Sequence, residues 1–173
     1  MALTERAWIE VDLKILEDNF LNLQNLVGAG VKVVPVIKAN AYGHGALRVA
    51  YKLIAMGVDM LALATLSEAA SLRQSGINLP ILILGGCPDG QELQAVTNRV
   101  TPAVYTKESL VRLSKVAMKL RKSIKYHIKI DTGLGRLGIQ PDDLLDFLEG
   151  GQTLKGVVLE GIFSHFSVAD DPT

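Results

Sequence analysis

The stretch "MLALATLSEAASLRQSGINLPILILG" (residues 60–85) contains the unit from which we expect the fold to be built. Its two apolar runs, at 60–65 and 80–85, have the length and composition of buried strands. The segment between them, 66–76, has the mixture of polar and apolar residues of an amphipathic helix. A strand, a helix and a second strand in this order indicate a parallel βα unit.

The same alternation runs through the rest of the chain. It begins with a helix whose apolar residues recur at helical spacing between Asp12, at an N-cap position, and Gly28, at a C-cap position. Six strands and five linking helices follow. We expect the helices at residues 13–27, 46–57, 66–76, 89–98, 106–122 and 140–150, and the strands at residues 31–37, 60–65, 80–85, 100–105, 124–131 and 156–166.

Six βα units fit two kinds of parallel sheet. They would fill a doubly wound open sheet, or they would form three-quarters of a closed eight-stranded barrel. No helix is predicted after the sixth strand, which is how an interrupted barrel would end. Periodicity alone leaves both designs open.

Composition and charge exclude several classes of protein. The chain has 173 residues, of which 49% are hydrophobic and 21% charged, enough for one domain with a sizeable core. Its 18 basic and 18 acidic residues cancel and form no basic stripe, so we expect no nucleic-acid partner. No apolar run reaches the ~20 residues of a membrane span, and the start lacks the layout of a signal peptide. The single cysteine, Cys87, suits a reduced thiol in a cytoplasmic protein.

The run "VVPVIKANAYGHG" (residues 33–45) ends a predicted strand with Lys38. In parallel sheets, functional groups gather where strands end. The simplest interpretation of such a lysine is a solvated surface residue. The alternative is a Schiff-base lysine, because an amine at the rim of an apolar barrel is partly desolvated, which favours its neutral, nucleophilic form. A lysine of this kind is the usual anchor of pyridoxal phosphate.

A second motif, "IKYHIKIDTGLGRLG" (residues 124–138), contains the pattern GxGxxG after a strand. A dinucleotide-binding fingerprint has this pattern, with an acidic residue about 20 positions further on, where Glu160 stands. A nicotinamide-dependent enzyme is therefore a remote alternative. In that fingerprint the third glycine lies in the first turn of the helix. Here Pro141 is the expected first helical position, so Gly138 would lie before the helix.

The strand of this motif has basic side chains at 125, 127 and 129 and apolar ones at 124, 126, 128 and 130. Because strand side chains alternate between two faces, Lys129 is expected to point into a barrel whose apolar face packs on the helices. A buried lysine without a partner is costly. The simpler interpretation is a Lys129 side chain that extends past the strand end into water.

Three segments resemble the N-terminal portion of the alanine racemases, which are fold-type III pyridoxal phosphate enzymes. They are "IKANAYGHG" (37–45), "KIDTGLGRLG" (129–138) and "GIFSHFSVAD" (161–170). The resemblance implies an α/β fold in which residues 12–173 form about six of the eight βα units of a (β/α)8 TIM-type barrel. It also implies pyridoxal phosphate as cofactor, alanine as substrate and a homodimer.

The first and third segments carry part of the implied site. Lys38 would bind the cofactor as an aldimine and serve as one of two catalytic bases, and Tyr42 would contact the cofactor phosphate. His165 would pack against the pyridine ring, although a histidine after a strand, taken alone, is more often structural. Asn40 and His44 are expected to shape the loop, with no catalytic role.

The second segment implies a modified lysine. In the family, the lysine matching Lys129 is carbamylated by carbon dioxide and becomes an anion that can orient Arg136. The guanidinium of Arg136 would contact the substrate carboxylate and the phenolic oxygen of the cofactor. Leu84 and Val36, which end predicted strands, would line the other side of the ring.

The resemblance implies that the parent protein interconverts L-alanine and D-alanine by two-base proton transfer, which supplies D-alanine for peptidoglycan. It covers only about the first half of the family's length. Strands seven and eight, the C-terminal β-domain and the opposite tyrosine base would lie outside this chain, so we expect the chain alone to be inactive. Residues 1–11 would form a strand that pairs with that domain. A non-catalytic pyridoxal phosphate-binding module is the alternative, and a decarboxylase of the same barrel class fits less well.

Overall fold

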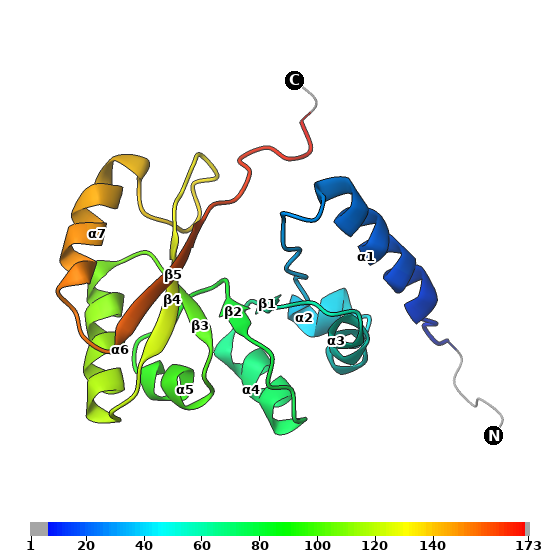
Figure 1. Ribbon diagram of the computed structural model, residues 1–173, viewed down its shortest axis with the longest axis horizontal. Coiled ribbons are helices and arrows are strands. Elements are labelled where there is room, and N and C mark those ends of the chain that lie inside the picture. The colour runs from blue at the N-terminus through cyan, green and yellow to red at the C-terminus, as the bar shows by residue number, and fades with distance from the viewer. Residues whose placement is uncertain (1–6, 172–173) are drawn as a thin grey trace.

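The computed structural model describes residues 7–171 and contains one parallel sheet. Its five strands lie in chain order, and every neighbouring pair is parallel (Figure 1). The strands are β1 (Leu61–Leu63), β2 (Ile81–Ile83), β3 (Thr101–Val104), β4 (Ile124–Lys129) and β5 (Val157–Phe163). A doubly wound sheet reverses its strand order at a switch point, whereas this order has no reversal. The expected α/β fold with part of a TIM-type barrel is confirmed.

Helices α3 to α7 follow one another around one side of the sheet (Figure 1). Local signals explain where they begin and end. In the first helix, for example, Oδ1 of Asp12 accepts from the backbone N–H groups of Lys14 and Ile15 as predicted, and Gly28 ends the helix with a φ of 79°. The helices are α1 (Leu13–Val27), α2 (Lys38–Tyr42), α3 (Ala46–Ala55), α4 (Leu66–Gln74), α5 (Glu92–Thr97), α6 (Lys107–Lys119) and α7 (Leu144–Gln152), the last preceded by a 3-10 turn, η1 (Pro141–Asp143).

The first predicted strand, 31–37, is reduced to a single parallel bridge between Val36 and Ala62. Two backbone hydrogen bonds of 2.9 Å hold it, from the Ile37 N–H to the Ala62 carbonyl and from the Ala62 N–H to the Pro35 carbonyl. Pro35 has no N–H to donate, and within residues 7–171 no second strand pairs with this segment. The segment therefore lies where a sixth strand was expected without forming a full ladder.

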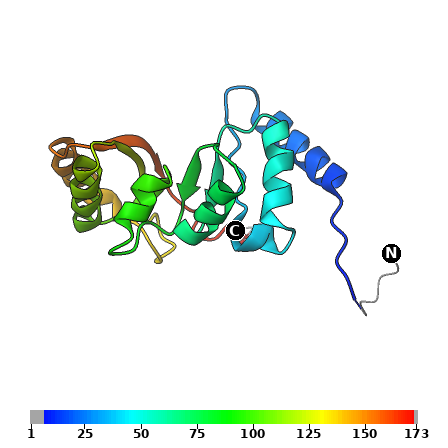
Figure 2. The same cartoon turned by 90° about the horizontal axis from the view of Figure 1, so that it is seen from below.

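The segment before α1 forms no strand in its described part, residues 7–11. It is exposed, with Trp8 at 59% and Ile9 at 84% of their full accessible surface, and Figure 2 shows it running away from the sheet. Residues 1–6 lie outside the described residues. The pairing of residues 1–11 with a C-terminal β-domain stays a prediction.

The two faces of the sheet have different surroundings. On the outer face, large apolar side chains pack against the helices as the main core. Among them are Leu61, Leu63, Ile81, Ile83, Val104 and Ile128 from the strands and Leu66, Leu110 and Leu113 from the helices. The inner face is more polar, because Thr101, Lys125, His127, Lys129 and Glu160 lie along it. No helix in the described range 7–171 is long and apolar enough to cross a membrane.

Candidate active site

The carboxyl ends of the strands surround a cavity of about 580 Å³. This volume lies within the ~300–1,000 Å³ that is typical of sites for small molecules. All seven residues that the sequence analysis singled out contribute to its lining. They are Val36, Lys38, Tyr42, Leu84, Lys129, Arg136 and His165. Residues that lie far apart in the chain thus meet at one place, while their roles stay predictions.

Lys38 begins α2, which is a left-handed turn that the sequence analysis missed. The φ angles of Ala39, Asn40, Ala41 and Tyr42 are 49°, 56°, 53° and 53°. An L-residue other than asparagine costs roughly 1–2 kcal/mol in a left-handed helical conformation, so Ala39, Ala41 and Tyr42 together cost roughly 3–6 kcal/mol. Backbone strain of this kind persists only where the surrounding structure holds it.

Several hydrogen bonds hold the turn. The N–H of Gly43 donates to the carbonyl of Ala39 at 3.1 Å. The Oδ1 atom of Asn40 accepts from the N–H of Ala46, the first residue of α3, at 2.8 Å, and Nδ1 of His44 lies 2.8 Å from the carbonyl oxygen of Ala41. Asn40 and His44 therefore shape the loop, as predicted.

The turn brings two predicted side chains to the cavity. Nζ of Lys38 lies 6.0 Å from the centroid of the Tyr42 ring, and both side chains line the cavity. Lys38 is half-buried and Tyr42 is 59% exposed. The amine therefore lies at the rim of the cavity, beside a phenol that solvent reaches.

Lys129 is buried, with only 5% of its surface exposed. Its Nζ lies 5.6 Å from the centroid of the Phe163 ring, and it forms no ion pair within residues 7–171. Burial lowers the pKa of the Lys129 ammonium, the positive charge of Arg136 lowers it further, and Asp131 acts in the opposite direction. The side chain points into the cavity as the strand alternation predicted, and the interpretation of a solvated strand-end lysine is wrong.

The glycine-rich segment after β4 is a loop held by one carboxylate. Oδ1 of Asp131 accepts from the N–H groups of Gly133 at 3.1 Å and Gly135 at 3.0 Å, and these bonds hold the pKa of Asp131 below its usual range. The loop then returns to the strand, where Ile139 pairs with Ile130.

Gly138 lies where the loop comes closest to the backbone of Ile130 and Asp131. A Cβ atom there would lie 2.3 Å from the backbone nitrogen of Asp131, and its φ is 141°. The glycine packs against its own strand, and the first helical turn begins only at Pro141. The geometry of a dinucleotide-binding turn is therefore absent from this motif, in line with the order of residues in the sequence.

The loops after β4 and β5 contact each other and bring Arg136 and His165 to the same cavity. The Oγ1 of Thr132 lies 2.5 Å from the Oγ of Ser164 and donates to the carbonyl of His165 at 3.3 Å. Arg136 and His165 are both exposed and both line the cavity.

A sequence model of the family described as "Alanine racemase, N-terminal domain" matches residues 11–173. The chain belongs to the alanine racemase family. It is 40% identical over 163 residues to the alanine racemase of Desulfovibrio desulfuricans, an alignment that covers 94% of this chain and 44% of that protein.

Solved structures of the alanine racemase family share the fold. The alanine racemase of Clostridium difficile 630 in complex with cycloserine has a TM-score of 0.95 at 39% identity, over 99% of this chain and 48% of that one. The alanine racemase from Bartonella henselae with covalently bound pyridoxal phosphate has a TM-score of 0.81 at 25% identity, over 91% of this chain and 46% of that one. The chain thus spans about half the length of the relatives that it matches.

In this member of the alanine racemase family the cavity is lined by basic and apolar side chains. Lys38, Lys129 and Arg136 are basic residues of its lining, and no Asp or Glu of the described residues lines the cavity. The apolar wall comes mainly from neighbouring strands and includes Val36, Leu82, Leu84, Ile162 and Phe163. Such a cavity suits a ligand that has both an anionic group and an apolar surface.

His127 is a cavity residue that the sequence analysis did not single out. Its Nε2 is buried without a hydrogen bond among the described residues, although Oε2 of Glu160 lies 3.5 Å away. Burial lowers the pKa of His127, and the carboxylate of Glu160 opposes that shift. The period-two pattern of the strand could have identified it, because His127 shares a face with Lys129.

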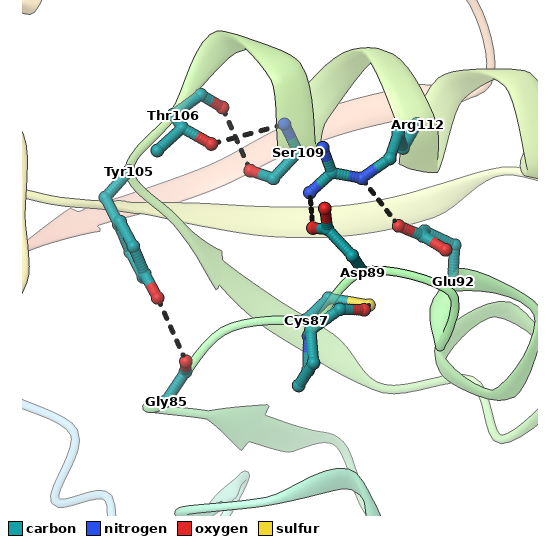
Figure 3. A network of polar contacts seen from close by, with 9 residues as sticks. Gly85, Cys87, Asp89, Glu92, Tyr105, Thr106, Ser109 and Arg112 are labelled. Atoms are coloured by element: carbon teal, nitrogen blue, oxygen red, sulfur yellow. Dashed lines mark hydrogen bonds and ion pairs between the residues drawn. The ribbon is translucent and has the colours of Figure 1, made fainter.

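A polar network supports the loop that follows β2, just beyond Leu84 (Figure 3). Arg112 bonds to the carboxylates of Asp89 and Glu92, the latter at 2.8 Å. The hydroxyl of Tyr105 donates to the carbonyl of Gly85 at 3.3 Å. Burial raises the pKa of the nearby Cys87 thiol to about 12, so the thiol is not poised for reaction. Of the residues in this network Gly85 lines the cavity, so the bond from Tyr105 holds the backbone at that edge.

Proposed function

We propose that the protein takes part in the pyridoxal phosphate-dependent interconversion of L-alanine and D-alanine, with the cavity as its cofactor site. The observation that carries the proposal is one cavity in which the amine of Lys38 lies at the rim, together with Lys129 and Arg136. Relatives named alanine racemase support it. The activity is proposed for the whole protein, because this chain spans about half the length of those relatives.

The residues around the cavity fit pyridoxal phosphate. The cofactor has an aldehyde, an anionic phosphate and a flat aromatic ring, and the cavity offers an amine, basic side chains and an apolar wall. Lys38 would hold the aldehyde carbon, and the hydroxyl of Tyr42 would donate to the phosphate. His165, Leu84 and Val36 would contact the ring.

When bound, pyridoxal phosphate supplies an electron sink that stabilises negative charge at the α-carbon of the amino acid. Nζ of Lys38, in its neutral form, would take or return the α-proton on one face. The base for the opposite face would come from outside the described residues, from the partner in a homodimer. Arg136 would bind the alanine carboxylate through two parallel hydrogen bonds and so fix which face meets Lys38.

Lys129 is proposed to be carbamylated. Its ammonium group would first lose one proton to become a neutral amine. The amine nitrogen would then bond to the carbon of carbon dioxide and lose a second proton, which leaves an anion where the side chain had been a cation. Two observations support this step. Only a neutral amine attacks carbon dioxide, and the lowered pKa of Lys129 favours that form. Arg136 lines the same cavity and is the cation that the new anion would orient.

Covalent capture of the cofactor tests the site. The chain is mixed with pyridoxal phosphate, reduced with borohydride and digested for peptide mass mapping. In the capture the nitrogen of Lys38 bonds to the aldehyde carbon with loss of water, and the hydride makes the bond permanent. We expect the label on Lys38, loss of that label in Lys38→Arg, and no change in Lys122→Arg, which alters an exposed lysine.

The outcome separates two functions from a third case, in which no cofactor site is formed. Label on Lys38, with racemisation by the whole protein followed by chiral chromatography, supports the proposal. Label on Lys38 without racemisation by the whole protein supports a non-catalytic pyridoxal phosphate-binding module. Label spread over exposed lysines in both variants would contradict a formed cofactor site.

A further inference from the structure

The carboxylate of Glu68 accepts three backbone hydrogen bonds. Its Oε2 accepts from the N–H groups of Ala64 at 2.9 Å and Thr65 at 3.0 Å, and its Oε1 accepts from the N–H of Ala39 at 2.6 Å. The bond from Thr65 belongs to the capping box at the start of α4, in which the Thr65 hydroxyl accepts from the Glu68 N–H. The bond from Ala39 has no part in capping α4, because it crosses to another element.

That crossing bond ends at the residue next to Lys38. Ala39 is the first residue of the left-handed turn, and its N–H is the first backbone donor after the lysine. The far end of the turn is closed by the bond from Gly43 to the carbonyl of Ala39, and Glu68 holds the near end. Two neighbouring parallel segments end beside Glu68, the one that contains Val36 and strand β1. The carboxylate of Glu68 therefore links the residues that follow the C-terminal ends of both segments.

We propose that Glu68 is a positioning residue for Lys38, which keeps the strained turn closed and so keeps the amine at the rim of the cavity. Glu68 does not line the cavity and acts only through Ala39. A carboxylate suits this place because both of its oxygens accept, and all three groups that face it are donors. The inference rests on the proposed function, since it concerns the amine that would capture the cofactor.

Glu68→Gln tests the positioning with little change of shape. The amide keeps one oxygen for Ala64 and Thr65, and its NH2 then faces the Ala39 N–H, donor against donor. Thr65→Ala is the matched control, because it removes the other half of the same capping box and leaves the bond to Ala39 in place. Urea unfolding of both variants shows how far each one lowers stability.

We expect Glu68→Gln to slow the capture of pyridoxal phosphate by Lys38 roughly tenfold or more, the factor that loss of a charge-assisted hydrogen bond implies. Thr65→Ala should capture the cofactor at the wild-type rate. In Glu68→Gln alone, the Ala39 amide should exchange with solvent faster and the backbone chemical shifts of residues 39–42 should move. The pH dependence of capture should also change in that variant, since the amine leaves its place.

Equal capture rates in the two variants, with an unchanged Ala39 amide, would overturn the role of Glu68. Failure of the proposed function has a different signature. The wild-type chain would then put no label on Lys38, while the exchange of Ala39 and the chemical shifts would still report whether Glu68 holds the turn.

Discussion

Replacing Ala39 by glycine should make the protein more stable, against the usual effect of this substitution. With φ 49° and ψ 50°, Ala39 adopts a left-handed conformation that costs an L-residue roughly 1–2 kcal/mol and glycine almost nothing. Its methyl group is exposed, so little burial is lost. Glycine also makes the unfolded chain more flexible, which costs about 0.4–1 kcal/mol. The net gain in the free energy of unfolding should be about 0.5–1 kcal/mol.

Ala70→Gly is the matched control, because Ala70 lies in the right-handed helix α4. There the substitution should cost about 0.5–1 kcal/mol, so the two variants should differ by roughly 1–2 kcal/mol with opposite signs. Urea unfolding followed by circular dichroism gives both values, provided that the slope of the free energy of unfolding against urea concentration is the same in all variants. A loss of stability in Ala39→Gly as large as that in Ala70→Gly would refute a strained left-handed turn beside Lys38.

Three further predictions concern the cavity. Gly138→Ala should lower the free energy of unfolding by roughly 3 kcal/mol or more, measured in urea, because the new Cβ meets the backbone of Asp131 and no side chain can move aside. In buffer free of carbon dioxide, Lys129→Met should raise that free energy by roughly 1–3 kcal/mol at neutral pH, since a buried ammonium is removed and an apolar stem remains. Because folding lowers the pKa of Lys129, the folded state binds fewer protons than the unfolded state, and the stability of the wild type rises with pH. The urea midpoint of the wild type should therefore approach that of the variant as the pH rises toward 10.5. Tyr42→Phe should reduce the preference of Lys38 for pyridoxal phosphate over pyridoxal roughly tenfold in the borohydride assay, and an unchanged preference would exclude a bond from Tyr42 to the phosphate.

Features that depend on neighbours in the chain could be predicted from the sequence. Asp12 and Gly28 bound α1 because a cap is a local interaction. Lys129 points into the cavity because the period of a strand decides the face of each side chain. Pro141 marks the helical start that sets the glycine-rich loop apart from a dinucleotide-binding turn.

Features that depend on distant contacts could not be predicted in the same way. Alanine rarely adopts positive φ, and nothing within "ANAY" shows that Glu68, 29 residues later, holds Ala39 in that conformation. The reduction of the first strand to a bridge likewise depends on which segment lies beside Val36, a matter of tertiary structure. Five residues of the site lie in motifs that resemble a known family, while Val36 and Leu84 were predicted from their places at strand ends. The distances between these seven side chains depend on tertiary structure and could not be read from the sequence.

The irregular parts of this fold gather at one rim, and two carboxylates hold them there. Asp131 accepts the backbone N–H groups of the loop that carries Arg136, and Glu68 accepts the first N–H of the turn that follows Lys38. Both acids are thereby turned toward backbone donors instead of the cavity, whose described lining contains no carboxylate. The same two contacts thus hold the turn after Lys38 and the loop that carries Arg136, and they leave no Asp or Glu of the described residues in the lining of the cavity. A cavity with this lining favours an anionic ligand such as the proposed cofactor, and the strained turn beside Lys38 lies at the same rim.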